Sequence, residues 1–134
     1  MLHSDLYAFL KDTKQIADLV GDRIYHEWMP QDTDKWPTMV FFQVSVTEQA
    51  EEMCPEESPR LDSSNYQFDI YGRKSKQVTE AADTFDSVFR NFVGTMGATR
   101  IQQIVLGNIS HLGEIVGDKM VRRVSLDYAI FHDV

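Results

Sequence analysis

The stretch from residue 65 to residue 93 carries two hydrophobic periods in succession, and it constrains the fold more than any other part of the chain. From Asn65 to Tyr71 apolar and polar side chains alternate, which predicts a strand with one buried face. After Gly72 the apolar spacing changes to three and four, which predicts an amphipathic helix from Ser75 to about Val93. The apolar stripe of this helix consists of Val78, Ala81, Ala82, Phe85, Val88, Phe89 and Phe92. A strand that leads directly into such a helix must bury both apolar surfaces in the same core.

The rest of the chain shows weaker periods of the same two kinds. A helical stripe predicts a first helix over residues 5–20, with Ser4 as its N-cap and Gly21 at its end. Further strands are predicted over residues 24–28, 38–47, 100–106 and 121–131, with residues 107–119 extending the last hairpin. The order α-β-β-β-α-β-β predicts an α+β fold, an antiparallel sheet of about five strands with two helices packed on one face.

The strand predicted over residues 38–47 is apolar on more than one side. Val40, Phe42, Val44 and Val46 are predicted to share one face. Met39 and Phe41 make the start of the other face apolar as well. This pattern indicates a strand covered on both sides at one end, or a subunit contact there.

The composition describes a single domain over residues 1–134. Its 43% hydrophobic content suffices for a core, and the longest apolar run, from Met39 to Phe42, is far too short to span a membrane. The N-terminal residues lack the basic and apolar regions of a signal peptide. The single cysteine, Cys54, excludes an internal disulfide and fits a reducing compartment. A net charge of −8, from 21 acidic and 13 basic side chains, disfavours tight binding to a phosphate backbone.

Residues 48–64 form an acidic, proline-interrupted segment without any apolar period. We predict a mobile acidic loop here, because such a composition cannot bury enough apolar surface to hold one conformation. Two interpretations are open. The segment is a solvated hairpin loop, or it becomes ordered only against a partner.

A search for catalytic, cofactor-binding or metal-binding residues finds no candidate set. His111 and Glu114 have the spacing of a metal pair only on a helix, and Gly113 disfavours a helix there. Cys54 stands among glutamates, which raise the pKa of a thiol and make it a poor nucleophile. Asp69 and Asp127 could pair as catalytic carboxylates on neighbouring strands, but they fall at outward-facing positions that are usually solvated. We therefore predict a protein that is not an enzyme and has no cofactor.

The order of short motifs along the whole chain resembles the tail-completion proteins of long-tailed phages, which are also called tail-terminator or tail-to-head joining proteins. Residues 19–25 are similar to the family's first helix end leading into Arg-Ile-Tyr, and residues 36–42 to its proline-led second strand. Residues 67–72 are similar to its third strand, and residues 122–131 to its closing strand. The chain departs from this pattern in a polar insert over residues 32–35 and around Cys54.

The resemblance implies a structural virion protein of the neck, without catalytic residues. Such a protein forms a ring, usually a hexamer, at the head-proximal end of the tail tube, ends tail growth and joins the tail to the head. Its partners would be further copies of itself, the tail-tube protein and the head-completion or connector proteins. DNA would pass through the ring without specific binding, and no membrane would be involved. The protein would be found in the virion, and in the host cytoplasm during assembly. The alternative is a small α+β ligand-binding or regulatory module without catalytic activity.

A ring built from identical subunits needs two different contact patches on each subunit. We predict that an acidic group on one subunit pairs with a basic turn on the next. The acidic group is Glu48, Glu51, Glu52, Glu56 and Glu57, and the basic turn is Arg73, Lys74 and Lys76. The other interpretation is that both groups are only solvated. Pairs of exposed charges of this kind contribute little each and are screened by salt.

Overall fold

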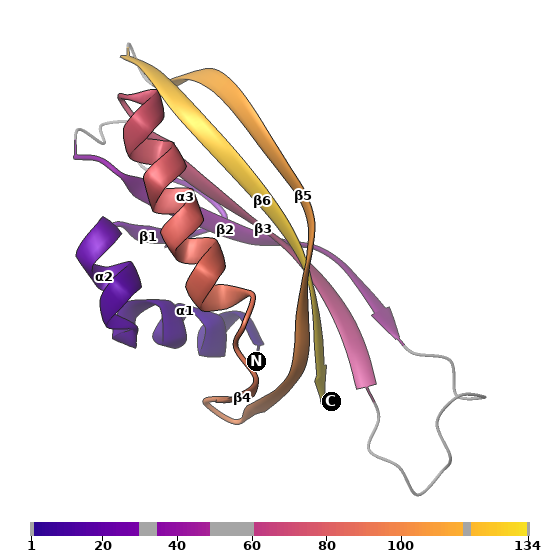
Figure 1. The fold of residues 1–134 in the computed structure, drawn as a ribbon. Coiled ribbons are helices and arrows are strands. Elements are labelled where there is room, and N and C mark those ends of the chain that lie inside the picture. Colours follow the sequence, from indigo (N-terminus) through magenta and orange to yellow (C-terminus); the bar gives the residue numbers. More distant parts are fainter. Residues whose placement is uncertain (1, 30–34, 49–60, 117–118, 134) are drawn as a thin grey trace, which may run out of the picture.

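The computed structural model describes residues 2–29, 35–48, 61–116 and 119–133, which form three helices and six strands (Figure 1). The helices are α1 (Leu2–Asp12), α2 (Lys14–Val20) and α3 (Ser75–Phe89). The strands are β1 (Ile24–His26), β2 (Thr38–Glu48), β3 (Leu61–Gly72), β4 (Gly94–Met96), β5 (Thr99–Val116) and β6 (Lys119–Asp133). The fold is α+β, as the sequence predicts, with one more helix and one more strand.

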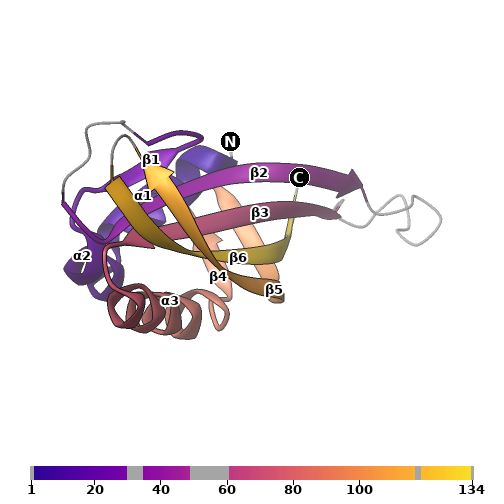
Figure 2. The same cartoon turned by 90° about the horizontal axis from the view of Figure 1, so that it is seen from above.

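The strands form a single mixed sheet in the order β1-β2-β3-β6-β5-β4, curled into a half-barrel (Figures 1 and 2). All neighbours pair antiparallel except β1 and β2, which run parallel. The prediction of a purely antiparallel sheet is therefore wrong at β1. Two parallel neighbours require the chain to return to the end of the sheet where the first strand began. The connection between β1 and β2 makes this return before β2 starts.

Helix α3 packs on the inner face of the sheet against β3 and β6, and the core forms between them. Tyr66, Phe68 and Ile70 are all buried, which confirms the alternation predicted for this strand. Most of the predicted stripe of α3 is buried as well, and Val88 and Phe92 lie partly buried at its margin. The strand-to-helix block around which the sequence is organised is thus the centre of the structure.

A close approach of backbone to side chains explains the glycine between β3 and α3. A Cβ atom at Gly72 would lie 2.7 Å from Val78 Cγ1 and 2.9 Å from Gln77 Oε1. No side chain fits there unless the first turn of α3 shifts. Gly72 thus lets the strand turn directly into the helix that covers it.

The first predicted helix is two helices, broken at Thr13. The backbone of Thr13 is extended, with a ψ of 116°, although its amide (3.0 Å) and its hydroxyl (2.7 Å) both donate to the Phe9 carbonyl. Ser4 is not an N-cap, because α1 begins at Leu2 and Ser4 lies within it. Gly21 does end α2, with a φ of 59° and an amide that donates to the Ala17 carbonyl at 2.7 Å.

The prediction that alternate residues of β2 share one face is wrong, because a β-bulge at Val44 shifts the register between Gln43 and Ser45. The bulge places Val46 opposite Ser64, on the face of Tyr66, and Val44 and Val46 are exposed by 59% and 48%. At its start β2 is covered on both sides, as the sequence indicates: Met39 and Phe41 lie in the main core. Val40 packs in a second cluster on the outer face of the sheet, together with Tyr71 and Val121.

Residues 107–116 extend the last hairpin as part of β5, as the sequence predicts. The two strands of the hairpin also reach slightly beyond their predicted outer ends. Residues 94–99, between the predicted helix and the strand predicted over residues 100–106, contain the short strand β4. The acidic loop predicted over residues 48–64 is shorter, since Glu48 pairs with Asp62 in the β2–β3 ladder and Leu61 belongs to β3. The prediction that the segment is mobile concerns residues 49–60, which lie outside the described part of the chain.

Candidate functional site

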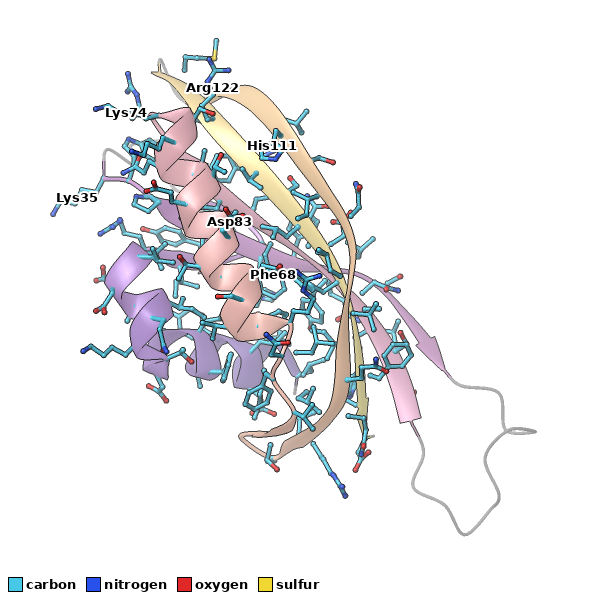
Figure 3. The ribbon with its side chains drawn as sticks, viewed as in Figure 1. Lys35, Phe68, Lys74, Asp83, His111 and Arg122 are labelled. Atoms are coloured by element: carbon cyan, nitrogen blue, oxygen red, sulfur yellow. The ribbon has the colours of Figure 1, made fainter. Side chains whose placement is uncertain are left out.

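The basic turn lies at one end of the sheet, between β3 and α3, and it is more extensive than the sequence indicates. Arg73, Lys74 and Lys76 are all exposed. The β3–β6 register places Arg122 opposite Gly72, so that exposed Arg122 lies at this same end of the molecule as Lys74 (Figure 3). We refer to Arg73, Lys74, Lys76 and Arg122 together as the basic end. Arg122 was missed because only the pairing of two distant strands brings it here.

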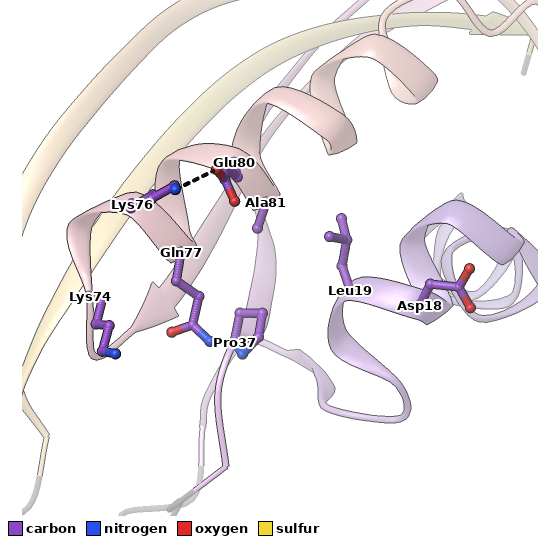
Figure 4. A pocket seen from close by; sticks show the side chains of 8 residues that line it. All are labelled: Asp18, Leu19, Pro37, Lys74, Lys76, Gln77, Glu80 and Ala81. Carbon is purple, nitrogen blue, oxygen red and sulfur yellow. Dashed lines mark ion pairs between the residues drawn. The ribbon is translucent and has the colours of Figure 1, made fainter.

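Next to the basic end, a surface pocket of about 340 Å³ lies between α2, α3 and the start of β2 (Figure 4). Lys74 and Lys76 line one side, and Leu19 and Pro37 form an apolar wall. Lys76 Nζ lies 3.9 Å from Glu80 Oε1 within α3, so part of the positive charge is offset by its own helix. Both side chains are largely exposed, and this pair contributes little to stability.

Glu48, the described member of the acidic group, lies towards the opposite end of the sheet. Glu48 ends β2, and its cross-strand partner Asp62 lies near the start of β3. The other four glutamates of the group, Glu51, Glu52, Glu56 and Glu57, lie outside the described residues. At a rise of about 3.3 Å per residue, the strands separate Glu48 from the basic end by roughly 30 Å. The structure thus keeps Glu48 apart from the basic turn within one subunit.

On the outer face of the sheet, a polar cluster surrounds Asp69 and contradicts the expectation that this carboxylate is solvated. Asp69 is only 3% exposed. Its Oδ1 accepts a hydrogen bond of 2.8 Å from Gln67 Nε2, and its Oδ2 lies 3.9 Å from Arg123 Nη1. Such partners are what a buried carboxylate requires, so this cluster is best explained as part of the packing.

Asp127 lies diagonally across the β3–β6 ladder from Asp69, on the same face of the sheet. Desolvation raises the pKa of Asp127, and the charge of Asp69 raises it further. Asp127 borders a shallow hollow of about 270 Å³ with Gln67, Asn65 and Val44, and it is the one carboxylate there. In the described residues this arrangement offers neither a base next to a nucleophile nor a second acid facing the same space, and it does not support catalysis.

Replacing Asp127 by asparagine is expected to stabilise the protein at pH 7. Because the pKa is higher in the folded state than in the unfolded state, the ionised carboxylate opposes folding, and this cost appears as the pH rises above about 4. The gain from Asp127→Asn should therefore be present at pH 7 and vanish towards pH 3 in urea unfolding experiments. Asp83→Asn, on the exposed side of α3 (Figure 3), is the matched control and should change stability by less than about 0.5 kcal/mol. Destabilisation of the Asp127→Asn variant at pH 7 would contradict this account of the outer face.

In the part of the chain that the structure describes, no group of three or more His, Cys, Asp or Glu side chains is placed to hold a metal ion. His111 lies on β5, so the helical spacing that would bring it next to Glu114 does not occur. No helix among these residues has the length and apolarity needed to cross a bilayer.

The comparisons with known proteins give one informative result. Neither a protein family model nor a curated protein sequence matches this chain. Among solved structures, the fold is similar to a chain in a structure titled "Virion of native gene transfer agent (GTA) particle". The two superpose with a TM-score of 0.76 and 12% sequence identity, and the match covers 99% of this chain and 95% of the other. At this identity the match shows a common fold over essentially the whole length of both chains.

Proposed function

We propose that this chain is a structural protein of a phage-like virion. In this role it forms a ring, of six copies by analogy with the family it resembles, at the head-proximal end of the tail tube. The ring ends tail growth and provides the joint to the head. The observation that carries the proposal is the fold match over 99% of the chain to a component of a gene transfer agent virion. It agrees with the resemblance of four separate segments of the sequence to tail-completion proteins.

The charge of the chain supports this function on physical grounds. A net charge of −8 gives a ring of several copies a negative wall, which repels phosphates and lets DNA pass without adhering. A role without catalysis also agrees with the chemistry of the described residues, in which the buried carboxylate of Asp69 is held by Gln67 and Arg123 of the sheet. The partners we propose are the tail-tube protein on one side of the ring and a head-completion or connector protein on the other.

Electron microscopy of the full chain with purified tail tubes tests the proposal. We expect rings in concentrated protein or, on addition of tubes, a cap at one end of each tube. Capped tubes should no longer elongate when free tail-tube protein is added, whereas tubes without this protein should. A protein that forms no ring, binds no tube end and leaves elongation unchanged would contradict the proposal and favour the alternative, a monomeric ligand-binding or regulatory module.

A further inference from the structure

The curled sheet has two open edges in the described part of the chain. On one side, β1 covers β2 only from Met39 to Phe41, so β2 has no neighbour there from Phe42 onwards. Glu27, with a φ of 77°, ends β1 at this point. On the other side, β4 covers β5 only as far as Ile101, and β5 has no outer neighbour from Gln102 onwards. Both stretches present backbone N–H and C=O groups in an extended conformation.

Neither open edge carries the side chains with which proteins usually protect such edges. Natural edge strands are blocked by charged residues, especially lysine, by proline or by β-bulges, and each of these edges contains a bulge, at Val44 on β2 and at Gly107 on β5. Here no Asp, Glu, Lys or Arg occurs between Lys35 and Glu48, and none between Arg100 and Glu114, although 25% of the chain is charged. Apolar side chains are exposed along both edges instead. They are Val44 and Val46 on β2, and Val105, Ile109 and Leu112 on β5, with exposures between 39% and 59%.

We propose that the two edges pair with each other between copies of this chain, β5 of one copy against β2 of the next. This inference rests on the proposed ring function, and it identifies the contact that closes the ring. The contact is heterologous, with a different patch on each side, which is what a ring requires. Pairing would bury Val44 and Val46 of β2 and Val105 of β5, and it would satisfy the open backbone groups by strand addition.

The sheet register places the two edges so that they can meet. The ladders connect Gln43 through Tyr66 and Tyr128 to Leu106, and they connect Thr47 through Ser63 and Phe131 to Gln103. The open part of β2 and the first open part of β5 therefore lie at the same height on opposite sides of the sheet. The directions also agree. The three antiparallel pairings from β2 to β5 make these two strands run in opposite directions, so copies related by an axis along the strands meet with antiparallel edges.

Electrostatics favours a second copy as the occupant of each edge. Two chains that each carry a net charge of −8 repel, and the repulsion is weakest where the contact surfaces hold no charge. The two edges are such surfaces, whereas the basic end and Glu48 lie at the two ends of the strands. In a ring joined edge to edge, these charged ends face along the ring axis. There they are available to the different partners above and below, and they do not pair between neighbouring subunits.

Lysine substitutions that block one edge at a time test the proposal. The variants are studied singly and as a mixture of two variants with different blocked edges. Val46→Lys blocks the β2 edge, and Val105→Lys blocks the β5 edge. Val93→Lys is the matched control, because Val93 is 70% exposed and lies on neither edge. The mass of each assembly is measured by analytical ultracentrifugation, with tail tubes present if the parent assembles only on them. Circular dichroism checks that each variant is folded.

We expect the control to assemble like the parent and each edge variant to remain monomeric. A mixture of the two edge variants should give a dimer of twice the monomer mass and nothing larger, because one intact β2 edge and one intact β5 edge remain. This dimer can form only from folded chains, so it also excludes misfolding as the cause of the lost assembly.

Three other results would overturn the inference, and they are distinguishable. If Val46→Lys alone dimerises, β5 pairs with itself. A second result is that both edge variants form rings like the control, whereas Arg73→Glu, Lys74→Glu abolishes the rings and adding Glu51→Lys, Glu52→Lys partly restores them. The contact is then the charge pairing predicted from the sequence. In either case the proposed ring function stands. If the parent assembles neither alone nor on tubes, the ring function itself fails, and the edge contact fails with it.

Discussion

Replacing Phe68 by alanine is expected to lower the free energy of unfolding by about 3–5 kcal/mol, a large part of the 5–15 kcal/mol that stabilises a typical domain. Phe68 is fully buried at the middle of β3, beneath α3 (Figure 3). Five aromatic rings surround it at centroid distances between 4.9 and 6.4 Å: Phe41, Tyr66, Phe85, Phe89 and Tyr128. Truncation leaves a cavity between three strands and a helix that cannot collapse without moving all of them.

Urea unfolding of the two proteins measures this loss as a shift of the midpoint at an unchanged slope. Phe68→Leu keeps much of the volume and should lose clearly less than the alanine variant. Val93→Ala, at a side chain that is 70% exposed, should change stability by less than about 0.5 kcal/mol. A loss below about 1 kcal/mol for Phe68→Ala would show that this ring is not at the centre of the core.

The central part of the fold could be predicted because one face of each element is buried there and the other is not. Tyr66, Phe68 and Ile70 alternate on β3, and the last strand repeats the pattern with Val124, Leu126, Tyr128 and Ile130, all of which are buried. Strong periods of this kind follow directly from the geometry of strands and helices. The same signal located α3 within a few residues of its observed end.

The elements that the sequence did not predict depend on single residues or on contacts between distant segments. The break between α1 and α2 lies at one residue, Thr13, whose backbone is extended inside an otherwise continuous apolar stripe. The face that Val46 occupies depends on one bulge, because a one-residue slip moves every following side chain to the other face. Strand β4 has only three residues, too few to show a period.

The candidate site was predicted in part, for the same reason. Arg73, Lys74 and Lys76 are adjacent in sequence and were identified as one basic turn. Arg122 joins them only through the β3–β6 register, which no local pattern reports. Asp69 and Asp127 occupy polar phases of alternating strands. The sequence shows that phase but not the side chains that cover the outer face.

Asp86 is not part of the predicted apolar stripe of α3, yet it is buried, with 8% exposure. Its Oδ1 accepts a hydrogen bond of 2.7 Å from the Tyr128 hydroxyl of β6, and its Oδ2 pairs with Arg90 one turn further along α3. Burial raises the pKa of Tyr128, and the hydrogen bond to Asp86 raises it further, so the tyrosine keeps its proton at all ordinary pH values. This contact joins the helix to the sheet by a polar interaction within the apolar core.

A double-mutant cycle on this pair is expected to show a coupling of about 1–3 kcal/mol. Asp86→Ala leaves the buried Tyr128 hydroxyl without an acceptor, and Tyr128→Phe leaves Asp86 with Arg90 alone. Each single change should therefore cost about 1.5–3 kcal/mol, the range for hydrogen bonds to charged groups. The double variant should cost clearly less than the sum of the two, since neither partner is then left unsatisfied. Urea unfolding of the four proteins at pH 7 gives the cycle, and strictly additive losses would mean that the hydroxyl and the carboxylate do not hold α3 to β6.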